Sequence, residues 1–186
     1  MRSARKSGTL LYNEVRSDVI KKKLCLIGPF GVGKTSLIRQ YVENIFSDTY
    51  LSTVGVKIDK KKVHLTEDTD VLLLIWDLEG IDDFNTFHTN YLEGMSGYFL
   101  VADGTRPETL KIVNKIARSL AEQYPEIPSI LLVNKSDLTE DWDIDKTQIE
   151  QSAENTIAAF VTSAKTGECV ETAFLEAARA MIAHGN

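Results

Sequence analysis

Residues 28–35 of this chain read Gly-Pro-Phe-Gly-Val-Gly-Lys-Thr, and this stretch decides the fold. An apolar run at residues 24–27 precedes it, and apolar residues at helical spacing follow it. A strand, a glycine-rich turn and a helix in this order can bind phosphate, because the glycines let backbone N–H groups face an anion. Lys34 would supply a charge to the terminal phosphates and the Thr35 hydroxyl a ligand for Mg²⁺, beside a helix N-terminus that favours anions. The stretch therefore predicts a phosphate-binding loop rather than a plain glycine-rich turn.

Length and composition are those of one ordinary globular domain. The chain has 186 residues, 43% of them hydrophobic and 26% charged. A net charge of −6 argues against a general nucleic-acid partner, and two cysteines are too few for a disulfide framework. There is no apolar run of transmembrane length, and the N-terminus is polar rather than signal-like. We expect a cytoplasmic protein with a basic N-terminal extension at residues 1–19, a single domain at 20–182 and a short tail at 183–186.

Strand and helix patterns alternate along the domain. Residues 71–76 form a continuous apolar run, typical of a strand covered on both faces, and residues 56–65 alternate as an exposed or edge strand does. Further strands are predicted at residues 24–27, 97–102, 130–133 and 158–161, and further helices at 108–123, 147–156 and from 170 onward. The three lysines at 21–23 are expected to precede the first strand. The alternation predicts an α/β fold with a mostly parallel sheet and a ligand at the carboxyl ends of the strands.

Chemically useful side chains follow two of these strands. Asp77 and Gly80 come after the run at 71–76, where the carboxylate could hold Mg²⁺ through water and the glycine N–H could meet a γ-phosphate. Both residue types are also common in ordinary turns. Asp137 follows the strand at 130–133, and its carboxylate can accept from two guanine donors that adenine does not offer together. An N-cap or turn role is the alternative for Asp137.

The sequence resembles the Ras superfamily of small GTPases, in its Rab-like branch, over roughly residues 20–182. The matching segments are GPFGVGKTSL, FSDTYLSTVGV, WDLEG, NKSD and SAK. The resemblance implies a P-loop NTPase three-layer sandwich, with a six-stranded, mostly parallel sheet flanked by five helices. It also implies binding of GTP, GDP and Mg²⁺. The implied nucleotide site consists of Gly31, Val32, Gly33, Lys34, Thr35, Ser36, Phe46, Tyr50, Thr53, Gly80, Asn134, Lys135, Asp137, Ser163, Ala164 and Lys165.

The resemblance also assigns roles to single residues. Thr35, Thr53 and, through water, Asp77 would hold the metal, and Thr53 would reach it only with GTP bound. Phe46 would pack against guanine, and Tyr50 would close over the phosphates. The implied catalytic positions are Lys34, Thr53, Gly80 and Ile81, the last standing where the family has a glutamine.

Four departures from the family pattern matter: three concern activity and one the C-terminal end. Phe30 stands in the phosphate loop where the family usually has a small residue, and Leu78-Glu79 replaces the usual Thr-Ala. Ile81 can neither donate nor accept a hydrogen bond, so it cannot orient an attacking water. The sequence ends without a prenylation cysteine, which leaves the family's usual lipid anchor unsupported and would also fit a prokaryotic member.

We therefore expect a molecular switch with slow GTP hydrolysis. Mg²⁺ and the γ-phosphate would order residues 46–55 and 78–92 and create a surface for an effector protein, with activating and exchange proteins as further partners. One alternative is an interaction module that binds GTP without turning it over, which Phe30 and Ile81 favour. A second is a P-loop ATPase or kinase, against which residues 134–137 argue.

Overall fold

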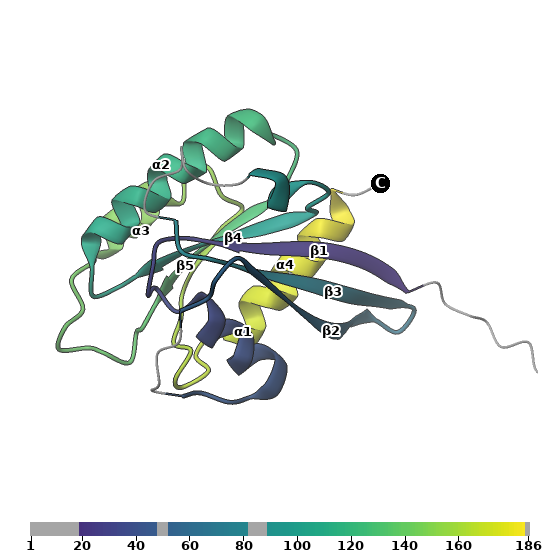
Figure 1. The fold of residues 1–186 in the computed structure, drawn as a ribbon, viewed down its shortest axis with the longest axis horizontal. Helices are drawn as coiled ribbons and strands as arrows, with labels where there is room; N and C mark the ends of the chain where they lie inside the picture. The colour runs from purple at the N-terminus through teal and green to yellow at the C-terminus, as the bar shows by residue number, and fades with distance from the viewer. Residues whose placement is uncertain (1–18, 48–51, 82–88, 185–186) are drawn as a thin grey trace, which may run out of the picture.

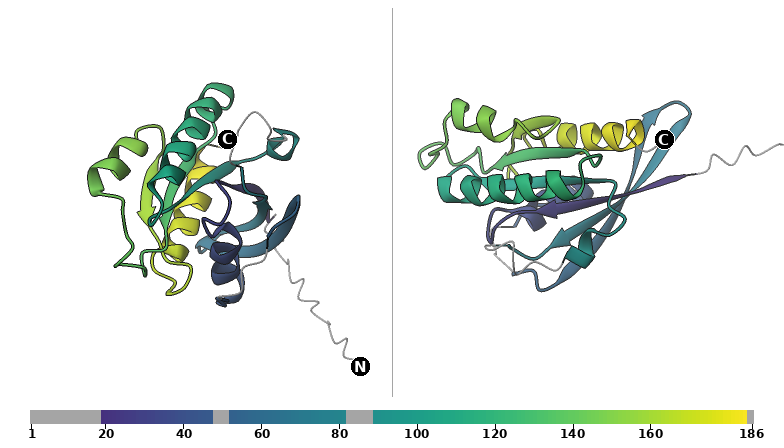
Figure 2. Two further views of the ribbon diagram at one scale, coloured as in Figure 1. Left: turned by 60° about the vertical axis from the view of Figure 1, so that its left-hand side comes forward. Right: turned by 90° about the horizontal axis from the view of Figure 1, so that it is seen from above.

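A six-stranded sheet forms the centre of the computed structural model, which describes residues 19–47, 52–81 and 89–184 (Figure 1). The strand order is β2-β3-β1-β4-β5-β6. The β2–β3 pair is antiparallel and every other neighbouring pair is parallel. The strands are β1 (Ile20–Ile27), β2 (Val56–Thr66), β3 (Thr69–Leu78), β4 (Gly97–Asp103), β5 (Ser129–Asn134) and β6 (Ala158–Val161). Figure 2 shows the long β2–β3 hairpin running along one edge of the twisted sheet.

Helices cover both faces of the sheet and complete the three-layer sandwich. Helices α1 (Lys34–Glu43) and α4 (Val170–Ala183) lie on one face, and α2 (Pro107–Gln123) and α3 (Lys146–Ser152) on the other (Figure 1). A short 3-10 helix, η2 (Thr89–Leu92), precedes β4. The described residues contain four α-helices, one fewer than the family resemblance implied, and residues 82–88 lie outside them. The α/β P-loop fold with a mostly parallel six-stranded sheet is confirmed.

Alternate residues of β1 supply the two halves of the core. Leu24 and Leu26 pack with α1 and α4, whereas Cys25 and Ile27 pack with α2 on the opposite face. All four are fully buried, as expected for a central parallel strand. The carboxyl end of β1 is thereby fixed between two apolar layers, and the phosphate loop starts there.

Three boundaries differ from the sequence prediction. Residues 21–23 lie inside β1, because β1 pairs with β3 from Ile20 onward. Strand β3 continues past residue 76 to Leu78, so Asp77 is a strand residue. Helix α3 ends at Ser152 rather than at residue 156, since the chain must turn for the N–H of Ile157 to reach the carbonyl of Ser129. Among the described residues, no helix is both long and apolar enough to cross a membrane.

Candidate functional site

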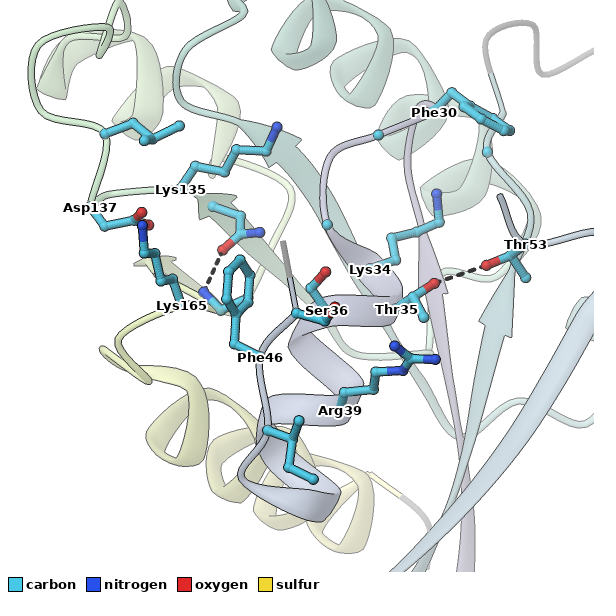
Figure 3. Close-up of a pocket in the computed structure, with 18 of the residues that line it drawn as sticks. Phe30, Lys34, Thr35, Ser36, Arg39, Phe46, Thr53, Lys135, Asp137 and Lys165 are labelled. Carbon is cyan, nitrogen blue, oxygen red and sulfur yellow. Dashed lines mark hydrogen bonds between the residues drawn. The ribbon is translucent and has the colours of Figure 1, made fainter. Parts of the chain in front are cut away.

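A pocket of about 290 Å³ opens at the carboxyl ends of the central strands (Figure 3). It brings together most of the residues that the sequence predicted for a nucleotide site. These are Gly31, Gly33, Lys34, Thr35, Ser36, Phe46, Thr53, Gly80, Asn134, Lys135, Asp137, Ala164 and Lys165. Val32 and Ser163 are buried behind the lining, and Tyr50 lies outside the described residues.

The phosphate loop joins β1 to α1 at the bottom of this pocket. Gly33 has a φ of +97°, and a Cβ there would lie 2.3 Å from the side-chain nitrogen of Asn134. Only glycine fits such a position without strain. The ammonium of Lys34 donates to the carbonyls of Gly28 and Pro29 at 2.8 and 3.0 Å. These carbonyls are therefore held by a cation at the start of α1, where the helix N-terminus also favours an anion.

Two hydroxyls in one wall of the pocket meet a carboxylate that lies behind them. The Thr35 hydroxyl donates to Asp77 Oδ2 at 2.6 Å and lies 2.8 Å from the Thr53 hydroxyl (Figure 3). Asp77 is buried, and its Oδ1 has no hydrogen-bond partner among the described residues. Burial raises the pKa of Asp77, although the hydroxyl of Thr35 and the charge of Lys34 oppose the shift. An unpaired buried carboxylate oxygen beside two hydroxyls suits Mg²⁺, which binds hard oxygen ligands.

The opposite end of the pocket is built from the loops after β5 and β6. The Asn134 amide donates to the carbonyl of Val32 at 2.9 Å and accepts from the N–H of Ala164 at 3.1 Å, so it ties both loops together. The Ser163 hydroxyl donates to Asp137 Oδ1 at 2.6 Å and thereby orients the carboxylate. Figure 3 shows the Phe46 ring pointing into the pocket on the side where Asp137 lies. This end offers a fixed acceptor and an aromatic surface, which suit a planar base with donors on its edge.

Phe30 and Ile81, the two unusual residues near the phosphate loop, lie in different environments. The Phe30 ring lies against Gly80, where an added Cβ would come within 2.4 Å of it, and Phe30 is 40% exposed. Ile81 is only 4% exposed and packs in the core on the α2 side of the sheet, while its N–H donates to the carbonyl of Gly28 at 3.1 Å. The residue at the glutamine position therefore belongs to the core rather than to the pocket wall.

Sequence reasoning missed several residues of the lining. They are Arg39, Ile45, Ser47, Leu78 and Leu138. Arg39 could have been found, because it follows Thr35 by one helical turn and a helical side chain leans toward the N-terminus of its helix. Figure 3 shows its guanidinium turned toward the Thr35–Thr53 pair. Ser47 and Leu138 lie in loops and carried no periodic signal.

Comparisons with known proteins agree with this geometry. A model of the Ras family matches residues 23–183. The Ras-related protein Rab-10 of Diplobatis ommata is 37% identical over 155 residues, which are 82% of this chain and 77% of that protein. The Ras-related protein Rab-13 of Canis lupus familiaris is 36% identical over 159 residues, 84% of this chain and 78% of that protein. Rab-10 of Caenorhabditis elegans is 33% identical over 163 residues, 87% and 81% of the two chains. The chain therefore belongs to the Ras family, as a Rab-like small GTPase.

Proposed function

We propose that this small GTPase is a GTP/GDP switch with slow intrinsic hydrolysis that controls the binding of an effector protein. The observation that carries the proposal is one pocket with a phosphate loop at one end and an oriented acceptor at the other. The distance between them is spanned by residues of α1 and by Phe46. A ligand with a polyanionic end and a base with two adjacent donors matches both ends, and guanosine di- and triphosphates have this chemistry.

At the phosphate end, we assign Lys34 to the terminal phosphates and Thr35, Thr53 and Asp77 to the metal. When bound, Mg²⁺ would neutralise phosphate charge and favour transfer of the γ-phosphoryl group to water. Thr35 is the second residue of α1, whereas Thr53 lies in the loop before β2, so the two hydroxyls come from separately anchored segments. Thr53 is thus suited to report whether a γ-phosphate is present, while Thr35 serves both nucleotides.

The start of β2 and the end of β3 are joined by a pair of bonds that suits a switch. The N–H of Glu79 donates to the carbonyl of Gly55 at 3.0 Å, and the Glu79 carboxylate accepts from the N–H of Gly55 at 3.1 Å. Gly55 is two residues from Thr53, and Glu79 precedes Gly80, whose N–H we assign to the γ-phosphate. A change at either nucleotide-contacting residue would therefore be transmitted to the other. We propose that this surface binds the effector and that activating and exchange proteins act on the same two segments.

Slow hydrolysis follows from the two unusual residues. Ile81 lies in the core rather than in the pocket lining, so no side chain at this position reaches the pocket to orient water. The absence of a positioned polar catalyst typically costs about 10²- to 10⁴-fold in rate. The Phe30 ring against Gly80 adds apolar bulk on the side where the attacking water would enter. We expect the protein to persist in its GTP form unless an activator supplies the missing groups.

The test is to extract and quantify the nucleotide carried by freshly purified protein and then to follow bound GTP in a single turnover. We expect guanine nucleotide at about one per chain and conversion to GDP over minutes to hours. Conversion within seconds would contradict the assignment of Ile81 and Phe30 as handicaps. A complete lack of conversion, even with Mg²⁺ in excess, would support a non-hydrolysing module instead. In a competition assay, ATP displacing bound guanine nucleotide as well as GTP does would overturn the assignment of Asp137 as the acceptor for the guanine base.

A further inference from the structure

A charged cluster centred on Asp103 lies behind the phosphate loop, and Lys135 is its one member among the pocket-lining residues that the structure describes. Asp103 ends β4, and its side chain is fully buried. Its Oδ2 accepts from Lys135 Nζ at 2.7 Å and from Arg106 Nε at 2.8 Å, while Oδ1 accepts from the N–H and hydroxyl of Thr105 at 3.0 and 2.7 Å. Burial alone would raise the pKa of Asp103, but the bonds from Lys135, Thr105 and Arg106 outweigh it and hold the pKa below its usual range. The carboxylate is therefore a fixed anion with its acceptor sites in use.

Arg106 links the buried Asp103 to the phosphate loop. Its Nη2 donates to the carbonyl of Phe30 at 2.9 Å, while its Nε stays on Asp103. A loop that points backbone N–H groups at an anion must point carbonyls away from it, and an outward carbonyl needs a donor. Lys34 donates to the carbonyls of residues 28 and 29, and the N–H of Ile81 also donates to the carbonyl of residue 28. Arg106 donates to the carbonyl of residue 30.

We propose that Arg106 is a positioning residue that holds the phosphate loop in the shape that accepts a β-phosphate, through the carbonyl of Phe30. The proposal rests on the guanine-nucleotide function proposed above. Asp103 orients both Arg106 and Lys135. One buried carboxylate therefore supports the phosphate loop and also the loop after β5, which carries Lys135 and Asp137. The guanidinium geometry is required, since its fork reaches two acceptors at once, whereas a lysine ammonium at the same position would keep only the ion pair.

The alternative is that Arg106 acts only as an exposed surface charge, and this alternative predicts a different effect on nucleotide binding. The Arg106 side chain is 39% exposed, and an exposed ion pair alone contributes little to stability. If Arg106 acted only as a surface charge, replacing it would change binding of all nucleotides slightly and equally. If Arg106 positions the phosphate loop, replacing it must reduce the affinity that the β-phosphate adds to nucleotide binding.

The experiment measures dissociation constants for GDP and GMP by isothermal titration calorimetry with Mg²⁺. The ratio of the GMP dissociation constant to the GDP dissociation constant isolates the contribution of the β-phosphate to affinity. Arg106→Lys should keep the unfolding temperature close to that of the unaltered protein and lower this ratio about tenfold, the equivalent of one lost hydrogen bond to a charged group. Arg106→Gln should lower it at least as much. Arg118→Gln, which removes an exposed arginine on α2, should leave the ratio within twofold.

The outcomes separate this inference from the function on which it rests. If the unaltered protein binds neither GDP nor GMP, the proposed function fails. If it binds both and Arg106→Lys leaves the ratio within twofold, Arg106 does not position the phosphate loop. A variant that weakens GDP and GMP equally would also overturn the inference, because it would indicate a general structural effect.

Discussion

Replacing Ile81 by glutamine tests whether this position can take part in catalysis at all. The side chain is 4% exposed and packs in the cluster that contains Leu78, Leu92 and Met95. If the glutamine stays there, its unsatisfied amide costs about 1–3 kcal/mol and the lost apolar burial about 1–2 kcal/mol more. If it swings out to the pocket, the cavity left behind costs about 2–4 kcal/mol. Either way Ile81→Gln should lower the free energy of unfolding by about 2–5 kcal/mol, a large part of the ~5–15 kcal/mol of a typical domain.

The assay pairs denaturant unfolding of the nucleotide-free protein with single-turnover hydrolysis. For a domain of this size, the expected loss lowers the melting temperature by roughly 4–20 °C. We expect hydrolysis to change by less than about threefold, because Ile81 lies in the core rather than in the pocket lining. Ile81→Leu is the matched control and should cost below about 1.5 kcal/mol. A glutamine variant of unchanged stability that hydrolyses GTP tenfold faster would refute this argument and would place residue 81 in the pocket.

Three further predictions concern single side chains of the described structure. Asp137→Asn should weaken GTP binding by about 2–5 kcal/mol and favour XTP, since xanthine has an oxygen where guanine has its amino donor; an unchanged GTP-to-XTP preference in competition binding would mean that another residue selects the base. Thr35→Ala should weaken Mg²⁺-dependent binding of GDP and GTP alike, whereas Thr53→Ala should spare GDP affinity and abolish the GTP-dependent hydrogen-exchange protection of its loop. Equal protection with GDP and GTP in the unaltered protein would contradict the switch. Burial raises the pKa of the Cys25 thiol to about 12, whereas Cys169 is exposed, so one thiol per native chain should react with a maleimide at pH 7 and two after denaturation.

The sequence predicted those parts of the site whose position depends on local order. Gly33, Lys34 and Thr35 had to lie at a strand-to-helix turn, because their neighbours show strand and helix patterns on either side. Asp137 had to lie at the same edge of the sheet, since parallel strands bring their carboxyl ends together. Local patterns and sheet topology were sufficient for these residues, and the structure gathers them around one pocket.

Residues whose role depends on packing between distant segments could not be placed in this way. Nothing near Ile81 in the sequence shows that its side chain enters the core against η2 and β4. Arg106 follows β4 in what looks like an ordinary turn, and only the fold brings it to the carbonyl of Phe30, 76 residues away. The boundary of β1 was missed for a related reason: pairing with β3 makes strand residues of three lysines that their own propensity would leave outside.

The charges around the pocket explain how an acidic protein can favour a polyanionic ligand. The chain carries a net charge of −6, yet within the described part of the chain the charged side chains lining the pocket are Lys34, Arg39, Lys135, Lys165 and one carboxylate, Asp137. That carboxylate is held by Ser163 at the base end, away from the phosphate loop. A triphosphate therefore meets a local field of the opposite sign to the net charge, and a low-dielectric cleft strengthens such a field. Raising the salt concentration should consequently slow nucleotide association more than it speeds dissociation, because screening acts on the long-range field while the short bonds at Lys34 and Asp137 stay intact.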